Sequence, residues 1–111
     1  MGKQELDALM PQWKVLEQMD GELSEIISKW RGNLFSAKNL EPKYKEIIMV
    51  CMNCIHCFEA GIELHMLRAI DQGATKEEIF DALTLTLLNG GFPSFRAGVY
   101  VFDSVFGVTK E

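Results

Sequence analysis

The sequence lacks the excess of positive charge that nucleic-acid-binding proteins carry. Its 111 residues include 11 Lys and Arg against 16 Asp and Glu, which gives a net charge of −5. Because phosphate backbones and anionic membrane surfaces both attract clustered basic residues, this balance argues against either partner. With 48% hydrophobic residues, the composition is typical of a folded domain and is too apolar for a disordered chain.

A long hydrophobic run and a secretion signal are also absent. The longest apolar run near the middle of the chain spans residues 47–52, far less than the roughly 20 residues of a transmembrane helix. The first ten residues, MGKQELDALM, are acidic where a signal peptide has a basic start and an apolar segment. Leu6 stands where a myristoylation signal has Ser or Thr. A reducing cytoplasm is therefore the expected location.

Cysteine is scarce, with 3 residues in the chain. So few do not make a disulfide scaffold, and an odd number cannot pair completely within one chain. We expect one domain over residues 1–111, with a radius of gyration of roughly 13 Å. A core of that size is small, so association between subunits would bury useful additional surface.

The first third of the sequence contains clear helical signals. Pro11 is suited to the first turn of a helix, after a break in the helical material of residues 1–20. Asp20 is placed to cap the next helix, which Gly32 and Asn33 are expected to end or loosen. That helix carries the clearest amphipathic stripe of the chain, formed by Leu23, Ile26, Ile27 and Trp30.

A connection over residues 36–41 precedes a long helical region that starts with Pro42 as a first-turn residue. This region runs to about Gln72, and Gly73 is expected to cap its end. Gly61 interrupts it, and a glycine in a helix interior costs about 1 kcal/mol. The sequence therefore predicts a bend or a junction of two helices at Gly61.

Thr75 and Glu78 match the capping box, in which each side chain accepts a hydrogen bond from the other's backbone amide. Residues 83–87 alternate like a strand, but the capping box and the lack of a partner strand predict a helix over 79–88. This helix is apolar nearly all round, which indicates burial at a subunit interface. A turn over residues 89–93 precedes a last helix, and the prediction is an all-α bundle of about six helices.

The three cysteines form a C-x2-C-x2-C pattern of Cys51, Cys54 and Cys57. An iron–sulfur cluster would need a fourth cysteine at Gly61 followed by proline. A zinc site with His56 or His65 would lack a second, distant pair of ligands. No metal or cofactor is therefore predicted. The thiols either form a redox dithiol, which requires a helix that breaks or begins near them, or pack as small buried hydrophobes on one helix face.

Two other residues have side chains suited to proton transfer. His65 lies in an apolar segment, where a histidine is either a hydrogen-bonded core residue or a proton shuttle. Glu46 lies in the first turn of the predicted helix, where a carboxylate either interacts with the helix dipole or acts as a general base. Spacing alone selects neither role.

The segment 63–83, ELHMLRAIDQGATKEEIFDAL, resembles the carboxymuconolactone decarboxylase family. That family has a histidine, an alanine-bearing helix, Gly-Ala-Thr, two acidic residues and isoleucine. Residues 90–93, GGFP, resemble its later Gly-x-Pro turn. The resemblance covers roughly residues 36–106 and implies an all-α fold that assembles into homotrimers or hexamers.

One branch of this family, the alkylhydroperoxidase-D-like proteins, reduces peroxides with a dithiol and a Glu/His proton relay. Counting back from His65, the glutamate of that branch falls on Glu46, but its cysteines fall on Phe58 and Gly61. Cys54 and Cys57 lie four residues earlier. Since that shift is about one helical turn, they are expected to point toward a pocket that holds Glu46 and His65.

The resemblance leaves three functions open. The first is a thiol-dependent peroxidase with antioxidant, peroxiredoxin-like activity and a thiol reductant protein as partner. In it Cys57 attacks the peroxide, Cys54 or Cys51 resolves the product, and Glu46 with His65 relays protons.

The second function is a cofactor-free decarboxylase or isomerase of a small lactone or keto acid, as in the family branch that lacks the cysteines. His65 would act as acid and base with help from Glu46 or Glu59, with Glu63 as a further acidic neighbour. Arg68 or Arg96 would face the substrate carboxylate. The third is a non-enzymatic oligomeric accessory protein, which a closed site beside His65 would favour.

Overall fold

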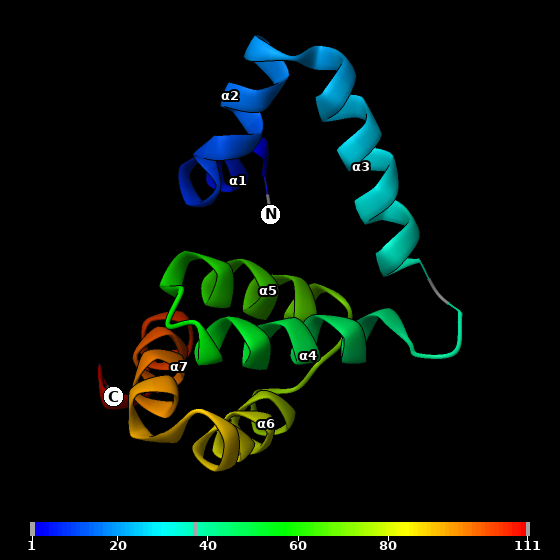
Figure 1. Cartoon of the computed structure of the whole chain (residues 1–111). Helices are drawn as coiled ribbons and strands as arrows, with labels where there is room; N and C mark the ends of the chain where they lie inside the picture. Colours follow the sequence, from blue (N-terminus) through cyan, green and yellow to red (C-terminus); the bar gives the residue numbers. More distant parts are fainter. Residues whose placement is uncertain (1, 37, 111) are drawn as a thin grey trace.

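Helices account for all the regular structure in the described residues, 2–36 and 38–110 of a computed structural model (Figure 1). The described part holds seven α-helices, where about six were predicted, and a short 3-10 turn, η1, at Val108–Lys110. The all-α prediction is confirmed. The helices are α1 (Lys3–Leu9), α2 (Pro11–Met19), α3 (Gly21–Phe35), α4 (Pro42–Ile55), α5 (Glu59–Asp71), α6 (Lys76–Asn89) and α7 (Gly91–Phe106).

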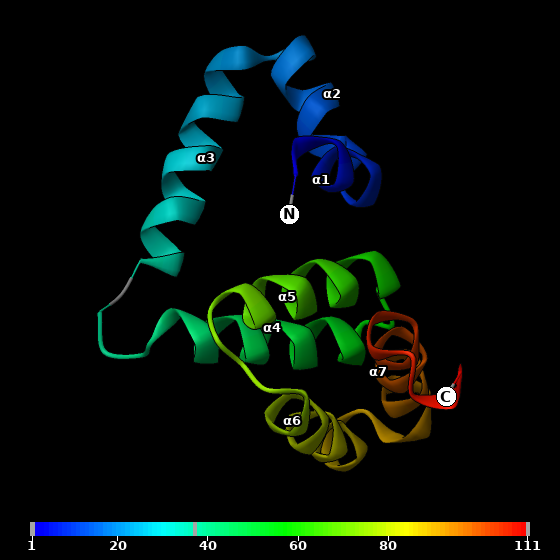
Figure 2. The ribbon, with the colours of Figure 1, turned by 180° about the vertical axis from the view of Figure 1, so that it is seen from behind.

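Helices α4–α7 form the body of the molecule, and α1–α3 form an arm that arches over α4 and α5 (Figures 1 and 2). Helices α4 and α5 pack side by side, and both also contact α7. All four body helices contribute to the core cluster, whose fully buried members include Val50, Ile62, Ile79 and Leu83. The radius of gyration is 14.7 Å, larger than the roughly 13 Å expected of a compact chain of this length, because the arm extends away from the body.

The arm contributes little to the core: α1, α2 and α3 contain no buried residue, and Met10, between α1 and α2, is buried. Helix α1 contacts α5, and the end of α3 is tied to α4. There Lys45 Nζ donates to the carbonyl oxygens of Leu34 and Ser36, each at 2.8 Å. A cation is favourable at this position because the last carbonyls of a helix have no partner within the helix. The predicted stripe of α3 is largely exposed: Leu23, Ile26 and Trp30 all face solvent in the single chain.

Most of the predicted helix starts are confirmed. Pro11 and Pro42 occupy first-turn positions of α2 and α4. The Asp20 carboxylate accepts from the backbone N–H of Leu23 at 3.0 Å and caps α3. Each of these residues supplies what a helix start lacks, a fixed φ angle or an acceptor for a free N–H.

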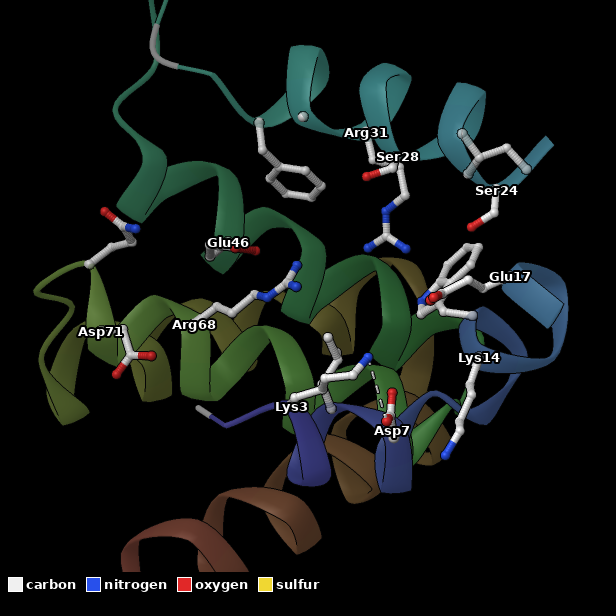
Figure 3. Close-up of a pocket in the computed structure, with 16 residues that line it drawn as sticks. Lys3, Asp7, Lys14, Glu17, Ser24, Ser28, Arg31, Glu46, Arg68 and Asp71 are labelled. Carbon is white, nitrogen blue, oxygen red and sulfur yellow. Dashed lines mark ion pairs between the residues drawn. The ribbon is translucent and has the colours of Figure 1, made fainter. Parts of the chain in front are cut away.

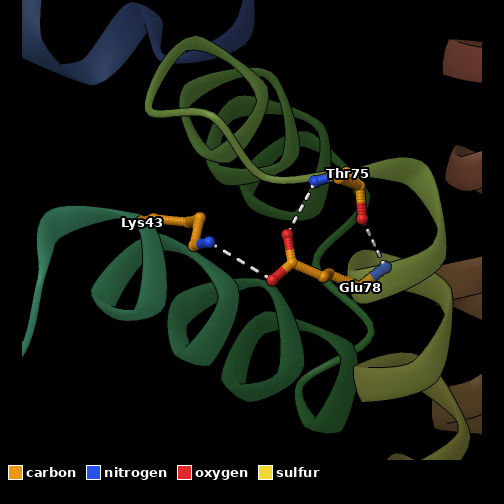
Figure 4. Close-up of polar contacts among 3 residues, drawn as sticks. All are labelled: Lys43, Thr75 and Glu78. Atoms are coloured by element: carbon orange, nitrogen blue, oxygen red, sulfur yellow. Dashed lines mark hydrogen bonds and ion pairs between the residues drawn. The ribbon is translucent and has the colours of Figure 1, made fainter.

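The capping box of α6 is present and is tied to α4 (Figure 4). The Glu78 N–H donates to Thr75 Oγ1 at 3.0 Å, and the Thr75 N–H donates to Glu78 Oε1 at 2.9 Å. Glu78 Oε2 also accepts from Lys43 Nζ at 3.2 Å. The Thr75 N–H and the Lys43 ammonium together lower the pKa of Glu78. The capping box therefore both starts α6 and joins it to the first turn of α4.

The junction between α4 and α5 lies at residues 56–58, so its predicted location at Gly61 is wrong. Cys57 has φ of 52°, its N–H donates to the Cys54 carbonyl at 2.9 Å, and the Phe58 N–H donates to the Asn53 carbonyl at 3.0 Å. This is the Schellman ending, which usually has glycine at the left-handed position. Gly61 instead lies inside α5, where an added Cβ would meet Phe58 Cδ2 at 2.7 Å.

Two other predicted boundaries need correction. Helix α3 continues through Gly32 and Asn33 to Phe35, where Lys45 provides partners for its final carbonyls. The predicted turn over 89–93 shrinks to Gly90, because α7 already begins at Gly91. Proline is tolerated there because the first turn of a helix needs no N–H donor. The connection over 36–41 is non-helical as predicted, apart from residue 37, which lies outside the described residues.

No helix in the described part of the chain has both the length and the hydrophobicity required to cross a membrane.

Candidate active site

Glu46 and His65 form a buried pair between α4 and α5. His65 Nδ1 lies 2.8 Å from Glu46 Oε1, and the two side chains are only 6% and 7% exposed. Glu46 is positioned by the buried face of α4, which it shares with Val50 and Cys54 at four-residue intervals. A carboxylate that accepts from Nδ1–H fixes the imidazole tautomer and leaves Nε2 with a free lone pair.

The Nε2 atom of His65 is available for chemistry. It has no hydrogen-bond partner among residues 2–36 and 38–110. In the same ranges, every side-chain nitrogen or oxygen that is fully shielded from solvent has a hydrogen-bond partner. Nε2 must therefore retain some access to the adjoining space. The ring is held from the arm by Phe35, whose ring centroid lies 5.8 Å away at an interplanar angle of 18°.

Two chambers meet at this pair, between the arm and the body. The polar chamber, of about 560 Å³, includes Glu46 and Arg68 in its lining. The apolar chamber, of about 510 Å³, includes His65 and Met49. Three residues line both chambers and form the partition between them: Trp13, Arg31 and Phe35. Both volumes lie in the roughly 300–1,000 Å³ range of small-molecule sites.

Two arginines lie in the chamber next to the pair. Arg31 projects from α3 and Arg68 from α5 into the polar chamber, where Glu46 also lies (Figure 3). Burial and then the charge of Arg68 lower the pKa of Arg31, while Glu46 raises it. The Arg31 guanidinium also lies 4.4 Å from the centre of the Trp13 ring, which helps to hold it in the partition. Both guanidinium groups thus lie near the Glu46 carboxylate, in a chamber whose lining also includes Lys3, Lys14, Asp7, Glu17 and Asp71.

The cysteine thiols lie elsewhere, and none of them lines either chamber. Cys51 Sγ donates to the Ala82 carbonyl of α6 at 3.5 Å. Cys54 is buried, and its Sγ lies against Gly98 of α7. Cys57 is exposed, with Sγ 3.7 Å from the Pro93 carbonyl. The expected approach of Cys54 and Cys57 to the Glu46–His65 pair is therefore not seen.

Burial makes two of these thiols poor sources of thiolate. It raises the pKa of Cys54 to about 12, with a further contribution from Cys51 and Cys57. Burial also raises the pKa of Cys51. The thiolate is the reactive form of cysteine. Cys57, the exposed thiol of the cluster, is therefore the one that solvent-borne reagents can reach.

Comparison with protein families matches most of this chain to a known group. The family model of the carboxymuconolactone decarboxylase family matches residues 21–103. The chain belongs to this family. The match begins at the start of α3 and so extends further toward the N-terminus than the roughly 36–106 expected from the sequence.

Two proteins of one archaeon are similar to this chain in sequence, and a bacterial protein of known structure is similar to it in fold. An uncharacterized protein of Methanocaldococcus jannaschii is 32% identical over 83% of this chain and 89% of its own length. A second uncharacterized protein of that organism is 23% identical over 85% of this chain and 88% of its own length. A crystal structure of a Thermotoga maritima protein has a TM-score of 0.77, with 98% of each chain covered. At 21% identity, that likeness shows the fold alone.

Within the family pattern, the two positions that hold cysteines in the peroxidase branch are part of the site. Phe58 and Gly61 both line the apolar chamber together with His65. The chamber therefore has a phenyl ring and a glycine hydrogen at the two positions where the resemblance places the thiols of that branch.

The remaining candidate residues separate into those at the site and those away from it. Arg68 lies in the polar chamber, whereas Arg96 lines a different hollow on α7 with Phe92. Glu59, Glu63 and His56 line neither chamber. Arg31 was not predicted, because its place at the site depends on how α3 folds back over the body. Among the described residues, no group of three or more His, Cys, Asp and Glu could hold a metal ion.

Proposed function

We propose that this protein is a cofactor-free acid–base enzyme that decarboxylates or isomerises a small keto acid or lactone. The observation that carries the proposal is the 2.8 Å contact between His65 Nδ1 and Glu46 Oε1 at the meeting point of two chambers. A histidine oriented in this way by a carboxylate is suited to move a proton through its other nitrogen.

The steps need no group beyond the residues present. In isomerisation, Nε2 takes a proton from the carbon beside a carbonyl and returns it at another position. In decarboxylation, the bond to the carboxylate breaks, its electron pair forms an enolate, and the imidazolium gives a proton to carbon as carbon dioxide leaves. Arg31 and Arg68 are placed to bind the anionic substrate and to stabilise charge that develops on oxygen.

Glu46 acts through His65 and is a positioning residue. Its carboxylate keeps the imidazole in one tautomer and stabilises the imidazolium that forms during the reaction. Glu46→Gln is expected to lower kcat while leaving KM nearly unchanged, and Glu46→Asp is expected to recover part of the loss. If Glu46 had a purely structural role, Glu46→Gln would lower the melting temperature without lowering kcat selectively over KM.

Proton exchange tests the proposal without requiring the natural substrate. A panel of 2-keto acids, 3-keto acids and carboxylated lactones in D₂O is followed by NMR for loss of the proton beside the carbonyl and for release of carbon dioxide. His65→Gln is expected to lower the rate by roughly 10²- to 10⁴-fold. His56 is the other of the chain's 2 histidines and lines neither chamber. His56→Gln should therefore leave the rate unchanged. No reaction across the panel, or equal loss in both variants, would contradict the proposal.

A thiol-dependent peroxidase is the second candidate, because α4 ends at Ile55, between Cys54 and Cys57. The regular helix that would keep these two sulfurs apart is absent at this point. The Cys57 thiolate would attack the peroxide O–O bond and release water or an alcohol. The resulting sulfenic acid would condense with Cys54 or Cys51, losing water, and a dithiol reductant would restore both thiols.

Peroxide turnover distinguishes the two candidates. With hydrogen peroxide and dithiothreitol, the peroxidase requires that Cys57→Ser abolishes peroxide consumption. The acid–base enzyme requires that keto-acid chemistry survives alkylation of the exposed thiol of Cys57. The cavity beside His65 argues against the third possibility, a non-enzymatic accessory protein with a closed site.

We also propose that the chain forms a homo-oligomer through α6. Leu85 and Leu88 on this helix are 63% and 82% exposed in the single chain, which is unfavourable for large apolar side chains that lie one turn apart. Family membership implies a trimer or hexamer. Light scattering after gel filtration is expected to give a multiple of the chain mass, and Leu88→Glu is expected to reduce it.

A further inference from the structure

The guanidinium groups of Arg31 and Arg68 have donors that no residue of the described ranges fills. Neither group forms a hydrogen bond or an ion pair with another residue within 2–36 and 38–110. The contact of Arg31 with Trp13 is a cation–π contact with the face of the indole ring. By contrast, Lys3 in the same chamber is paired with Asp7. Each guanidinium has five N–H donors in a fork that matches a carboxylate.

The apolar chamber has the opposite character. Several of its hydrophobic side chains are exposed to the chamber and to solvent, among them Leu34, Ile48 and Phe58 at 48%, 45% and 45%. Large apolar side chains around one hollow favour an occupant that removes them from water. The polar chamber next to it is lined by charged groups from both the arm and the body (Figure 3).

We propose that the substrate is an amphipathic carboxylate, with its carboxylate on Arg31 and a medium-length alkyl chain or a ring in the apolar chamber. Arg31 is the group that fixes this arrangement, because it lines both chambers. A carboxylate held there leaves the remainder of the molecule in the apolar chamber, against the ring of His65. This inference rests on the proposed function and specifies its substrate class.

Arg68 has a different part in the same arrangement. It lines the polar chamber with Glu46 and does not line the apolar one. It therefore adds attraction for the anionic end without contacting the apolar end. Removal of Arg31 should weaken binding of long carboxylates more than binding of short ones, because Arg31 lies where the two chambers meet. Removal of Arg68 should weaken both by a similar factor.

Tryptophan fluorescence gives a direct binding test. The chain has 2 tryptophans, and both of them, Trp13 and Trp30, line the apolar chamber. The probes are octanoate, octanamide, which has the same chain without the charge, and acetate, which has the charge without the chain. Titrations use the full-length protein and its His65→Gln variant, so that binding is measured where the proposed chemistry is absent. Octanoate is expected to shift the emission and to bind at least tenfold more tightly than either other probe.

Variants connect the binding to the named residues. Arg31→Met is expected to weaken octanoate binding at least tenfold, and Arg31→Lys to retain most of it. Arg96→Met is the matched control, because Arg96 lies on α7 outside both chambers, and it should bind as the parent does. If Arg31→Met fails to fold, as judged by its circular dichroism and melting curve, Arg68→Met provides the second test.

The inference would be overturned by equal affinity for octanoate and octanamide, by no response to octanoate, or by equal losses in Arg31→Met and Arg96→Met. A second copy of the chain in the apolar chamber would appear as emission that changes with protein concentration and not with octanoate, which also overturns it. Keto-acid turnover without octanoate binding would reject this inference alone. Octanoate binding without any turnover in the panel would reject the proposed function alone.

Discussion

The ring of Phe35 lies stacked on the ring of His65, with centroids 5.8 Å apart and planes inclined by 18°. Phe35 is the last residue of α3, and His65 lies in the middle of α5. One contact therefore connects the end of the arm to the imidazole that is proposed to move protons. The orientation of that imidazole depends on Glu46 from the body and on Phe35 from the arm.

Replacing Phe35 with leucine should lower catalytic efficiency without abolishing it. Leucine keeps an apolar wall but loses a ring contact worth about 1 kcal/mol, which corresponds to about a fivefold effect. Steady-state kinetics on a substrate from the keto-acid panel measure the change. Phe92→Leu is the control, because Phe92 is 78% exposed on α7 and should leave the kinetics unaltered.

Replacing Cys57 with glycine should stabilise the protein, whereas alanine at the same position should not. Both changes remove the thiol, but only glycine relieves the left-handed backbone, where φ is 52°. The expected difference between the two variants is about 1 kcal/mol. Urea unfolding followed by circular dichroism measures it. Equal stability of the two variants would show that the backbone at Cys57 carries no strain.

The three thiols should react with iodoacetamide at very different rates at about pH 8. Cys57 is exposed, Cys51 is partly buried, and Cys54 is fully buried with its pKa raised to about 12. The expected order of alkylation is therefore Cys57, then Cys51, then Cys54. Mass spectrometry of timed digests gives the three rates. In guanidinium chloride they should converge, and rapid labelling of Cys54 in the native protein would contradict its described burial.

The Glu78 carboxylate should make stability depend on pH in the acid range. Its folded pKa is lowered, first by the Thr75 N–H and then by Lys43. A group whose folded pKa lies below its unfolded value of about 4.3 stabilises the fold above that value and loses this effect as pH falls through the folded pKa.

Melting temperatures measured from about pH 6 down to about pH 3 test this expectation. The advantage of the parent protein over Glu78→Gln should be present at the upper end and shrink toward the lower end. Glu77→Gln, at the neighbouring exposed position in the same helical turn, should show no such trend.

Local chemistry made much of the fold predictable from the sequence. Pro11, Asp20 and the Thr75–Glu78 box act within a few residues of where they stand, so their patterns locate helix starts directly. Gly73 is another case: its N–H donates to the Ile70 carbonyl at 2.9 Å in a left-handed ending of α5. The same ending occurs after α4 with Cys57 in the glycine position, and for that reason the sequence placed the junction incorrectly at Gly61.

The site was less predictable, because it depends on contacts between distant elements. Glu46 and His65 are 19 residues apart, and the family resemblance indicated both, although spacing alone would not have. Arg31 carries no local signal, since a basic residue on an amphipathic helix is ordinary on a solvated face. The cysteine pattern indicated a dithiol near the pair, but the Cys54 and Cys57 sulfurs lie against α7 instead.

The arm carries one whole side of the site, yet its helices bury no residue of their own. Segments with few buried contacts open locally at free energies well below that of global unfolding. Amide hydrogens of α3 should therefore exchange with solvent faster than those of α5, and an occupant of the chambers should slow α3 selectively. The measured affinity of any ligand then includes the free energy of closing the arm, so changes at positions of α1 or α2 that line neither chamber can tune binding without contacting the ligand.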